Sequence, residues 1–586
     1  MSDHLIEDYM VSPCSNFLSE HLNGTRGLSD IVSGTYLKNT IKTFQKANTT
    51  TDYVMVCKLL NYLSKKIHDQ FAADSDLILF VDHHTATPKF HPNDVDAKPD
   101  VIAVLKSTWK KYQRSRKSRR IVSWHDILSA VEAKPTWANL EGVAQCGSYG
   151  EYLNQARPDM PSVYCLTMSS RSYEILYSDA SGLYVSTSFS WSTLRPLAQY
   201  IYTLYVPRAD RLTFDPTISL AEPGSITQPT WNVEFNNKVY KNCEVTFVGE
   251  PWRRMSWIAI APATEDEPKV AIKDSYRSVG RTWREGDLFD ILQQKESHVS
   301  CTDPEYGLSC MPETVEPGAG PAPGWVHVIA HGDVSVHGGL IQTPKTCCRR
   351  IKTRLVMGST GDPLAKCRTI LEFLKVMYDI LEAHRWAVAT RNILHRDISW
   401  ANILVHPEGS QTTNLQGHRP KFIDELLSGV PHSPSNALLF DLDNACELDR
   451  SRAKAPSFAK SLTRSPSTER LRAKTGTPMY ISRSVGQGRL LWDQHDCVPM
   501  PVLTGAAEVA YHQAYSDIPL RCLADSGGST HGGKYSDEFR KELRRGGRVN
   551  GSNTVPATML NPFTGLSSSF YCALNPRTPS VSTSTS

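Results

Sequence analysis

The feature that most constrains the fold of this chain is the segment at residues 395–402, which reads His-Arg-Asp-Ile-Ser-Trp-Ala-Asn. Apolar residues at helical spacing precede it at 367–386, and the strand-like residues 403–405 follow it. We therefore predict a helix, a short polar loop and a strand in this order. The loop carries a carboxylate, Asp397, and, five positions later, an amide, Asn402.

The spacing of Asp397 and Asn402 suits phosphoryl transfer. That reaction needs a carboxylate to orient the acceptor hydroxyl and take its proton, and an amide oxygen to help hold a metal ion. We therefore predict catalytic roles for both residues, and a metal-binding role for Asn402. The alternative is a chance match in a helix-to-strand turn.

A strand that ends in lysine is the second part of the predicted phosphoryl-transfer site. Residues 270–273 read Val-Ala-Ile-Lys, and a lysine in such a strand can hold nucleotide phosphates. Such a lysine requires a glutamate on the following helix. We choose Glu285 and keep Glu296 as the fallback; for either, a solvated helix-face glutamate is the alternative. Lys273 is thus a predicted catalytic and cofactor-binding residue, and Glu285 a cofactor-binding one.

The third part is an aspartate after an apolar strand. Asp441 follows the apolar residues 437–440, and its carboxylate suits Mg²⁺. Asp443 stands where the usual motif has glycine, and a turn-capping aspartate is the alternative. The basic, Ser-rich run at 450–474 is typical of an activation segment regulated by phosphorylation, or else of a solvated loop.

Together these segments resemble the fungal-type protein kinase family, a branch of the eukaryotic-like kinases. The likeness spans roughly residues 30–540 and rests on residues 98–101, 212–217, 270–276, 284–286, 395–399, 440–443, 475–481 and 531–533. It implies an α+β, bilobal kinase fold that uses ATP and Mg²⁺. The implied activity is that of a serine/threonine-protein kinase, a transferase that phosphorylates a protein substrate.

The chain departs from this family in three places. Gly249 is the one glycine at 248–254, where a glycine-rich loop should approach the phosphates, so Gly249 is our cofactor-binding candidate. Ser399 stands where ordinary serine/threonine kinases carry a second catalytic lysine; this replacement is usual within the family, but it removes a charge partner of the γ-phosphate. The residues after His531 lack the helix that braces the catalytic loop, so we expect an incomplete C-lobe. The glycine-poor loop and the short C-lobe favour an alternative function, a catalytically weak pseudokinase or scaffold that binds nucleotide or partner proteins.

Composition predicts four regions. They are an N-terminal α/β accessory domain at 1–225, a kinase N-lobe at 226–345, a C-lobe at 346–545 and a disordered tail at 546–586. Within the first region we predict helices at 51–71 and 193–205, and strands at 77–81, 101–105, 121–124, 163–168 and 182–186. Residues 406–436 should form an inserted surface loop.

The N-terminal region also permits a less favoured function, that of a metal-dependent nuclease module. Asp100, Glu132 and Lys134 fit the pattern Pro-Asp…Glu-x-Lys, in which two carboxylates hold a divalent ion and the lysine orients water. Glu132 and Lys134 should point the same way from a strand. We expect this backbone arrangement in a nuclease-like fold without activity, because no clear third acidic ligand precedes Asp100. The candidates for that ligand are Asp82, Asp94 and Asp96.

Charge and cysteine content limit the partners and the compartment. The formal net charge is only +4, and the basic run at 110–120 is the one segment that suggests nucleic acid. No apolar stretch is long enough for a membrane helix, and the acidic start does not resemble a secretory signal. The 14 cysteines contain no Cys-x-x-Cys pair, so we predict an intracellular protein, cytoplasmic or nuclear.

Overall fold

The structure is a computed structural model. It describes residues 10–14, 16–46, 53–114, 122–134, 140–222, 227–252, 254–265, 267–281, 283–293, 322–344, 349–410 and 420–447. Four predicted features lie outside these residues: the activation segment at 450–474, the segments at 475–481 and 531–533, and the tail at 546–586. Glu296 also lies outside them. Within the described part, no helix has the length and apolar character that a membrane crossing requires.

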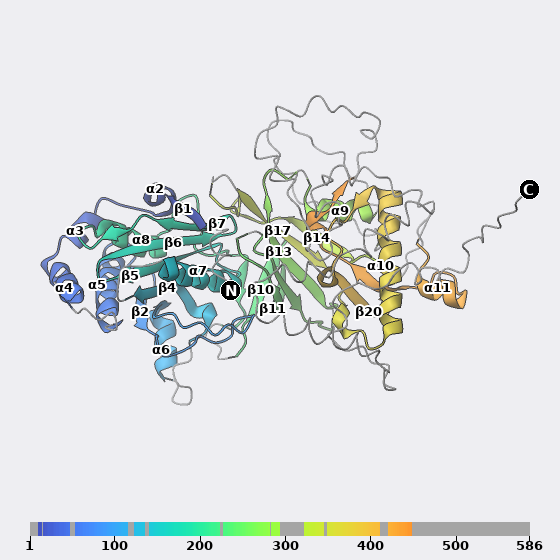
Figure 1. Cartoon of the computed structure of the whole chain (residues 1–586), viewed down its shortest axis with the longest axis horizontal. Helices are drawn as coiled ribbons and strands as arrows, with labels where there is room; N and C mark the ends of the chain where they lie inside the picture. Colours follow the sequence, from blue (N-terminus) through green and yellow to red (C-terminus); the bar gives the residue numbers. More distant parts are fainter. Residues whose placement is uncertain are drawn as a thin grey trace, which may run out of the picture. The chain divides into compact units, whose positions relative to one another are not determined.

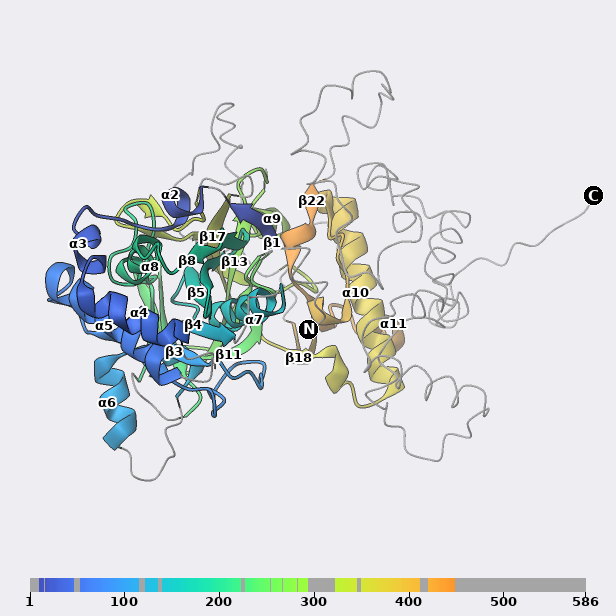
Figure 2. The same cartoon turned by 60° about the vertical axis from the view of Figure 1, so that its left-hand side comes forward.

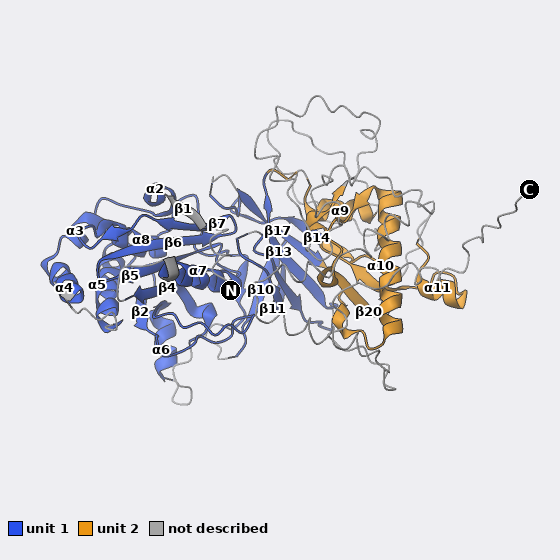
Figure 3. Ribbon diagram, in the orientation of Figure 1, with its two compact units in different colours: residues 1–279, 311–314, 330–356 blue, residues 280–310, 315–329, 357–586 orange. Residues whose placement is uncertain are grey.

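The described residues form two compact units (Figure 3). Those of 1–279 and 330–356 belong to unit 1, and those of 280–293, 322–329 and 357–447 belong to unit 2. Most strands of the predicted N-lobe thus cluster with the N-terminal region. The predicted boundaries at 225 and 345 stay predictions. The mixture of helices and strands agrees with the α+β class.

Unit 1 begins with an eight-stranded sheet (Figure 1) of order β1-β7-β6-β5-β4-β3-β2, to which β8 adds beside β6. The strands are β1 (Met10–Cys14), β2 (Ile78–Asp82), β3 (Val101–Leu105), β4 (Ile127–Lys134), β5 (Ser162–Ser169), β6 (Ser172–Asp179), β7 (Gly182–Ser186) and β8 (Phe189–Ser190). Strands β2, β3 and β4 are antiparallel, whereas β4 and β5 are parallel. A parallel pair needs a crossover, and helix α7 (Leu140–Ala156) supplies it.

Helices cover both faces of this sheet, with β4 and β5 between α7 on one side and the other helices on the opposite side (Figure 2). That opposite layer contains α2 (Phe17–His21), α3 (Leu28–Val32), α4 (Thr35–Lys46), α5 (Tyr53–Phe71) and α8 (Arg195–Tyr205). Helix α6 (Lys106–Arg114) follows β3. The alternation of side chains sends Val131 into the α5 core and Ala130 into the α7 core.

Most predicted elements of this region are confirmed, but the predicted strand at 121–124 is wrong. Residues Trp124–Asp126 form a 3₁₀ turn, η1, and the strand begins only at Ile127. Val122 and Trp124 are fully buried in the α7 core, so their apolar character reflects packing of a turn. A short apolar run cannot distinguish these two environments.

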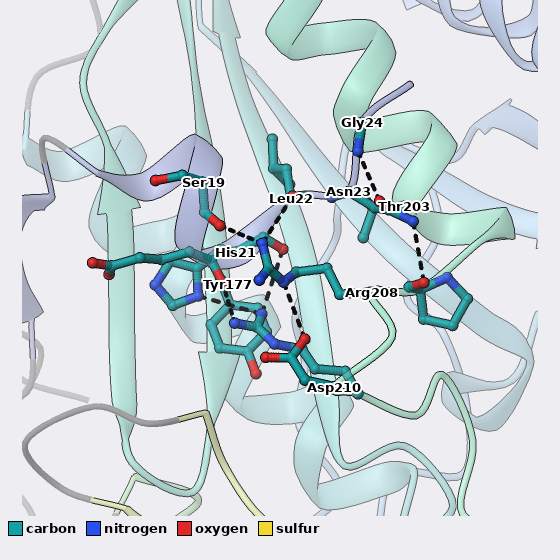
Figure 4. Close-up of polar contacts among 12 residues, drawn as sticks. Ser19, His21, Leu22, Asn23, Gly24, Tyr177, Thr203, Arg208 and Asp210 are labelled. Atoms are coloured by element: carbon teal, nitrogen blue, oxygen red, sulfur yellow. Dashed lines mark hydrogen bonds and ion pairs between the residues drawn. The ribbon is translucent and has the colours of Figure 1, made fainter. Parts of the chain in front are cut away.

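A polar network holds residues 19–24 against α8 and the segment that follows it (Figure 4). The Arg208 guanidinium donates to the carbonyl of Ser19, and it also pairs with Asp210 at 3.1 Å. The backbone amide of Asn23 donates to Thr203 Oγ1 at 2.8 Å. Backbone groups of a non-regular segment therefore find partners on α8 and on the segment that follows it.

The second sheet, most of which belongs to unit 1, has the order β14-β17-β13-β12-β11-β10-β9. Its strands are β9 (Ile218–Leu220), β10 (Thr230–Phe235), β11 (Lys238–Val248), β12 (Trp257–Ala261), β13 (Val270–Ser278), β14 (Val328–Asp333) and β17 (Arg350–Met357). The small hairpin of β15 (Ser335–Val336) and β16 (Gly339–Leu340) connects β14 to β17. Strand β13 therefore lies inside the sheet, between β12 and β17.

A buried cluster of four charges fastens this sheet to the segment before β9. Arg354 pairs with Asp274 at 2.7 Å, and Lys352 contacts Asp215 at 2.6 Å and Asp274 at 3.0 Å. All four side chains are almost inaccessible to solvent. The opposite charges hold the carboxyl pKa values of Asp215 and Asp274 below their usual range despite burial.

Unit 2 is built around the long helix α10 (Ile370–Arg391). Its other helices are α9 (Glu285–Leu292) and α11 (Ile423–Ser428). One sheet has the order β18 (Asp362–Pro363), β20 (Ile403–Ser410) and β21 (Ser435–Leu439), and a second pairs β19 (Ile393–Leu394) with β22 (Cys446–Glu447). The 3₁₀ turns are η2 (Leu364–Lys366), η3 (Trp400–Asn402) and η4 (Leu442–Asn444). Thr369 caps the N-terminus of α10, and Asn392 ends it in a left-handed conformation with φ 57°.

The predicted surface loop at 406–436 is wrong in part, because α11 and the start of β21 lie within it. Asp379 of α10 accepts hydrogen bonds from the backbone amides of Ile423 and Asn436, both at 2.8 Å. One buried carboxylate thus orders two segments whose polar sequence resembles a loop.

Candidate active site

The loop after α10 and β19 is organised by a buried histidine. The backbone amide of Asp397 donates to His395 Nδ1 at 3.2 Å, so Nε2 carries the proton and donates to the carbonyl of Phe440 at 2.8 Å. Burial holds the His395 pKa below its usual value, which keeps the ring neutral. Trp325 stacks on this ring at a centroid distance of 5.9 Å. The histidine therefore links the catalytic loop to the segment that carries Asp441.

Two amide side chains hold Asp397. Asn402 Nδ2 donates to the backbone carbonyl of Asp397 at 2.8 Å, and Asn444 Nδ2 donates to its carboxylate oxygen Oδ2 at 2.9 Å. Asn402 and Asn444 are buried, whereas Asp397 is half-buried. The carboxylate is thus oriented from two sides while it keeps access to solvent. The sequence did not reveal Asn444, which has no distinguishing motif of its own.

Asp441 lies at the turn after β21, as the sequence predicted, and has the left-handed conformation with φ 65°. Its Oδ1 accepts from the backbone amide of Asp443 at 3.3 Å. Asn402 lies beside this turn, because its backbone carbonyl accepts from the amide of Phe440 at 3.2 Å. The structure therefore brings the two predicted metal-binding residues onto adjoining segments.

Three carboxylates gather at this turn. Glu285, Asp441 and Asp443 each offer one ligand oxygen, and these oxygens lie within 4.8 Å of one another. Glu285 also accepts from the backbone amide of Leu442 at 3.0 Å, and Arg281 approaches Asp443 at 3.9 Å. Hard cations such as Mg²⁺ take carboxylate oxygens, so the donor set fits a divalent metal. The sequence identified Glu285 only as a partner of Lys273, and it treated Asp443 as a departure from the motif.

Lys273 and Gly249 belong to unit 1. Lys273 lies on β13 opposite Ile258 of β12, and its side chain is 3% exposed. Glu285 belongs to unit 2, so the pairing of Lys273 with Glu285 stays a prediction. The nucleotide-binding role of Gly249 also stays a prediction.

The segment between β11 and β12, where a glycine-rich loop was expected, is fastened within unit 1. The carbonyl of Gly249 accepts from Gln155 Nε2 of α7 at 3.2 Å. Trp252 packs into the α7 core at 5% exposure, and its indole donates to Ser178 Oγ at 2.9 Å. Trp252, a bulky residue in this segment, therefore serves as an anchor to the first sheet and α7.

Comparison with known families agrees with the geometry of unit 2. Residues 317–498 match the family model described as Fungal protein kinase. Over these residues the chain is similar to the fungal protein kinase family. The matched fungal protein kinase segment includes Asp397, Asn402 and Asp441 but begins after Lys273 and Glu285. A search of curated proteins found no match to the chain.

Proposed function

We propose that this chain is an ATP- and Mg²⁺-dependent protein kinase that phosphorylates serine or threonine hydroxyls. The match of residues 317–498 to the family model described as Fungal protein kinase supports a kinase-type enzyme. The observation that carries the finer proposal is the orientation of Asp397. Asn444 fixes one carboxylate oxygen, and the candidate metal ligands Asp441 and Asp443 lie on the turn after β21.

The proposed mechanism assigns one task to each residue. ATP supplies the γ-phosphoryl group, and Mg²⁺ offsets the charge of its phosphates. Asp397 accepts the proton of the substrate hydroxyl. Asn444 orients its carboxylate through Oδ2, and the half-buried side chain can still be reached by a substrate. Asp441 and Asn402 would hold Mg²⁺. Lys273 would contact the phosphates, with Glu285 as its partner.

The proposal includes a bilobal kinase fold. Its support is the order of parts along the chain, which runs from the lysine strand β13 through α9 to α10, the catalytic loop and Asp441. Protein kinases require these parts in this order. The N-terminal sheet of unit 1 is then an accessory region.

A catalytically weak scaffold is the second candidate, and the anchored segment around Gly249 favours it. Backbone amides that approach phosphates closely need a glycine-rich, adaptable loop. Here Trp252 is buried, and the carbonyl of Gly249 is already engaged by Gln155. Such a segment adapts less readily to a nucleotide.

The test is transfer of radiolabelled phosphate from ATP to a mixture of basic and acidic protein substrates. We expect Asp397→Ala to lower the rate by on the order of 10²-fold or more, because it removes the group that takes the proton. Asp362→Asn is the matched control, since Asp362 is exposed on β18 of the same unit. Equal rates for Asp397→Ala and the parent would exclude Asp397 from the mechanism.

A thermal-shift titration with Mg²⁺-ATP separates the two candidates from a protein that does not bind nucleotide. A ligand at 100 times its Kd stabilises the folded state by about 2.7 kcal/mol. Stabilisation with phosphoryl transfer supports the kinase. Stabilisation without transfer supports the nucleotide-binding scaffold.

A further inference from the structure

A second group of acidic and basic side chains lies in unit 1, at one end of the first sheet. Val101 is opposite Val131 in the antiparallel pair β3–β4, which places Asp100 opposite Glu132. Glu132 and Lys134 alternate along β4 with Val131 and Ala133, so both point to the face that α7 covers. The arrangement expected from the sequence is therefore present.

Hydrogen bonds hold this group in one geometry. The backbone amide of Ala133 donates to Asp100 Oδ2 at 2.8 Å, and Lys134 Nζ lies 2.7 Å from Glu132 Oε1. The Tyr149 hydroxyl of α7 donates to Glu132 Oε2 at 3.0 Å. Gln145 accepts from Lys134 at 2.7 Å and donates to Tyr149 at 2.8 Å, which closes the network from the α7 side.

Burial and strand register fix how these acidic side chains lie. Glu132 is 2% exposed, and the β3–β4 register places Asp100 opposite it. Asp82 is opposite Val101 in the antiparallel pair β2–β3, and like Phe80 and Val101 it alternates onto the face that α5 covers. Asp82 therefore lies on the other face of the sheet from Glu132, and the group contains two carboxylates and one lysine.

Two buried polar atoms beside this group lack a partner within the described residues. Thr167 is paired with Glu132 across β4–β5, and Glu174 is paired with Thr167 across β5–β6. Thr167 Oγ1, at 0% exposure, and Glu174 Oε2, at 7%, accept or donate no hydrogen bond there. A Cβ built on Gly142 would lie 3.2 Å from Lys134 Cγ and 3.6 Å from Thr167 Oγ1. The Thr167 hydroxyl therefore faces the lysine side of the group, where a bound ligand would satisfy it.

We propose that Asp100 and Glu132 bind a hard divalent cation, Mg²⁺ or Mn²⁺, and that this site hydrolyses phosphodiesters. Two carboxylates satisfy only part of the coordination shell of such an ion and leave positions for water and a phosphate oxygen. Lys134 and Thr167 are positioned beside those ligands. The site is independent of the three carboxylates of unit 2.

The reaction balances with water as its only co-reactant. A water molecule loses a proton to solvent and attacks phosphorus, forming one P–O bond. The P–O bond to the leaving oxygen breaks, and that oxygen takes a proton from a second water. Lys134 would orient the attacking water or a phosphate oxygen. In the structure Lys134 pairs with Glu132, and a cation bound to Glu132 would release the lysine for this role.

The metal site is tested by Mn²⁺ titration of the full chain, with free Mn²⁺ measured by electron paramagnetic resonance. Asp441→Asn first removes a candidate metal ligand from the cluster of Glu285, Asp441 and Asp443. In that background, we expect Glu132→Gln to weaken Mn²⁺ binding by at least about 10-fold. Glu244→Gln, an exposed change on β11, is the control. Unchanged Mn²⁺ binding in a Glu132→Gln chain that melts at the temperature of its parent overturns the site.

The hydrolytic step is tested on the same proteins with supercoiled plasmid DNA and with single-stranded RNA, each with Mn²⁺. These two probes share the phosphodiester and distinguish its source. We expect the Asp441→Asn chain to cleave at least one probe and Glu132→Gln to abolish cleavage of that probe. Absence of cleavage of both probes by the parent and by Asp441→Asn overturns the hydrolytic step, while the titration decides the metal site separately.

Discussion

At the scale of single residues, Asn444 is the side chain that most directly controls the orientation of the proposed base. It donates to Asp397 Oδ2 at 2.9 Å, and its own Oδ1 accepts from Arg281 at 3.5 Å. We expect Asn444→Ala to lower kcat by roughly 10- to 100-fold with little change in KM, because small errors of orientation are costly in catalysis. Steady-state kinetics measure this split. A proportional rise in KM with constant kcat would assign Asn444 to substrate binding instead.

His384 is a residue whose burial makes stability depend on pH. Its Nε2 accepts from the backbone amide of His395 at 3.3 Å, and burial, with a smaller contribution from His395, lowers its pKa to about 3. Between about pH 6.5 and 3 the unfolded chain binds the proton and the folded chain does not. The stabilisation is complete above pH 6.5 and is lost as the pH falls toward 3.

We therefore expect His384→Gln to flatten the dependence of stability on pH. The parent should lose about 1.4 kcal/mol more than the variant for each pH unit below 6.5, down to the folded pKa. Urea unfolding of both proteins at pH 7 and at pH 5.5 measures the difference. Parallel changes in the two proteins would contradict the assignment to His384.

At the scale of elements, the charge cluster of Asp215, Asp274, Lys352 and Arg354 joins β13 and β17 to the segment before β9. Removal of one partner leaves buried charges without compensation. We expect Asp274→Asn to destabilise unit 1 by about 3–5 kcal/mol, whereas Glu244→Gln on β11 should change stability by less than about 0.5 kcal/mol. Chemical denaturation followed by tryptophan fluorescence measures both variants.

The same cluster predicts the response of these elements to acid. The carboxyl pKa values of Asp215 and Asp274 are lowered in the folded state, so the unfolded chain takes up protons first as the pH falls. Their stabilisation is complete well above the unfolded value of about 3.8 and declines only below it. A parent chain whose excess stability over Asp274→Asn disappeared already at pH 6 would contradict this account.

At the scale of the whole molecule, the proposed kinase needs a residue from each unit. Lys273 belongs to unit 1 and Glu285 to unit 2, and we predict that their charged groups approach within about 4 Å in the active state. If so, Lys273→Met and Glu285→Gln should be strongly non-additive in their effects on the affinity for Mg²⁺-ATP. We expect a coupling energy of about 0.5–3 kcal/mol in a double-mutant cycle. Additive effects would indicate that the two residues do not act as a pair.

The sequence alone determined the local features of this protein. Apolar spacing predicted α5, α8 and α10, and the segment at 395–402 predicted a catalytic loop between a helix and a strand. These features depend on contacts between near neighbours, whose spacing is set by the period of a helix or a strand. The shared face of Glu132 and Lys134 could be predicted for the same reason, because alternation along β4 is a local rule.

Only the tertiary structure decided which distant residues meet. The cluster of Glu285, Asp441 and Asp443, the hydrogen bond from Asn444 to Asp397 and the burial of Trp252 all join segments far apart in the chain. The turn at Trp124–Asp126 and helix α11 were misjudged for a related reason, since long-range packing and hydrogen bonds order them. Such contacts follow from the order of strands in a sheet and the path of the connecting chain, which residue patterns do not encode.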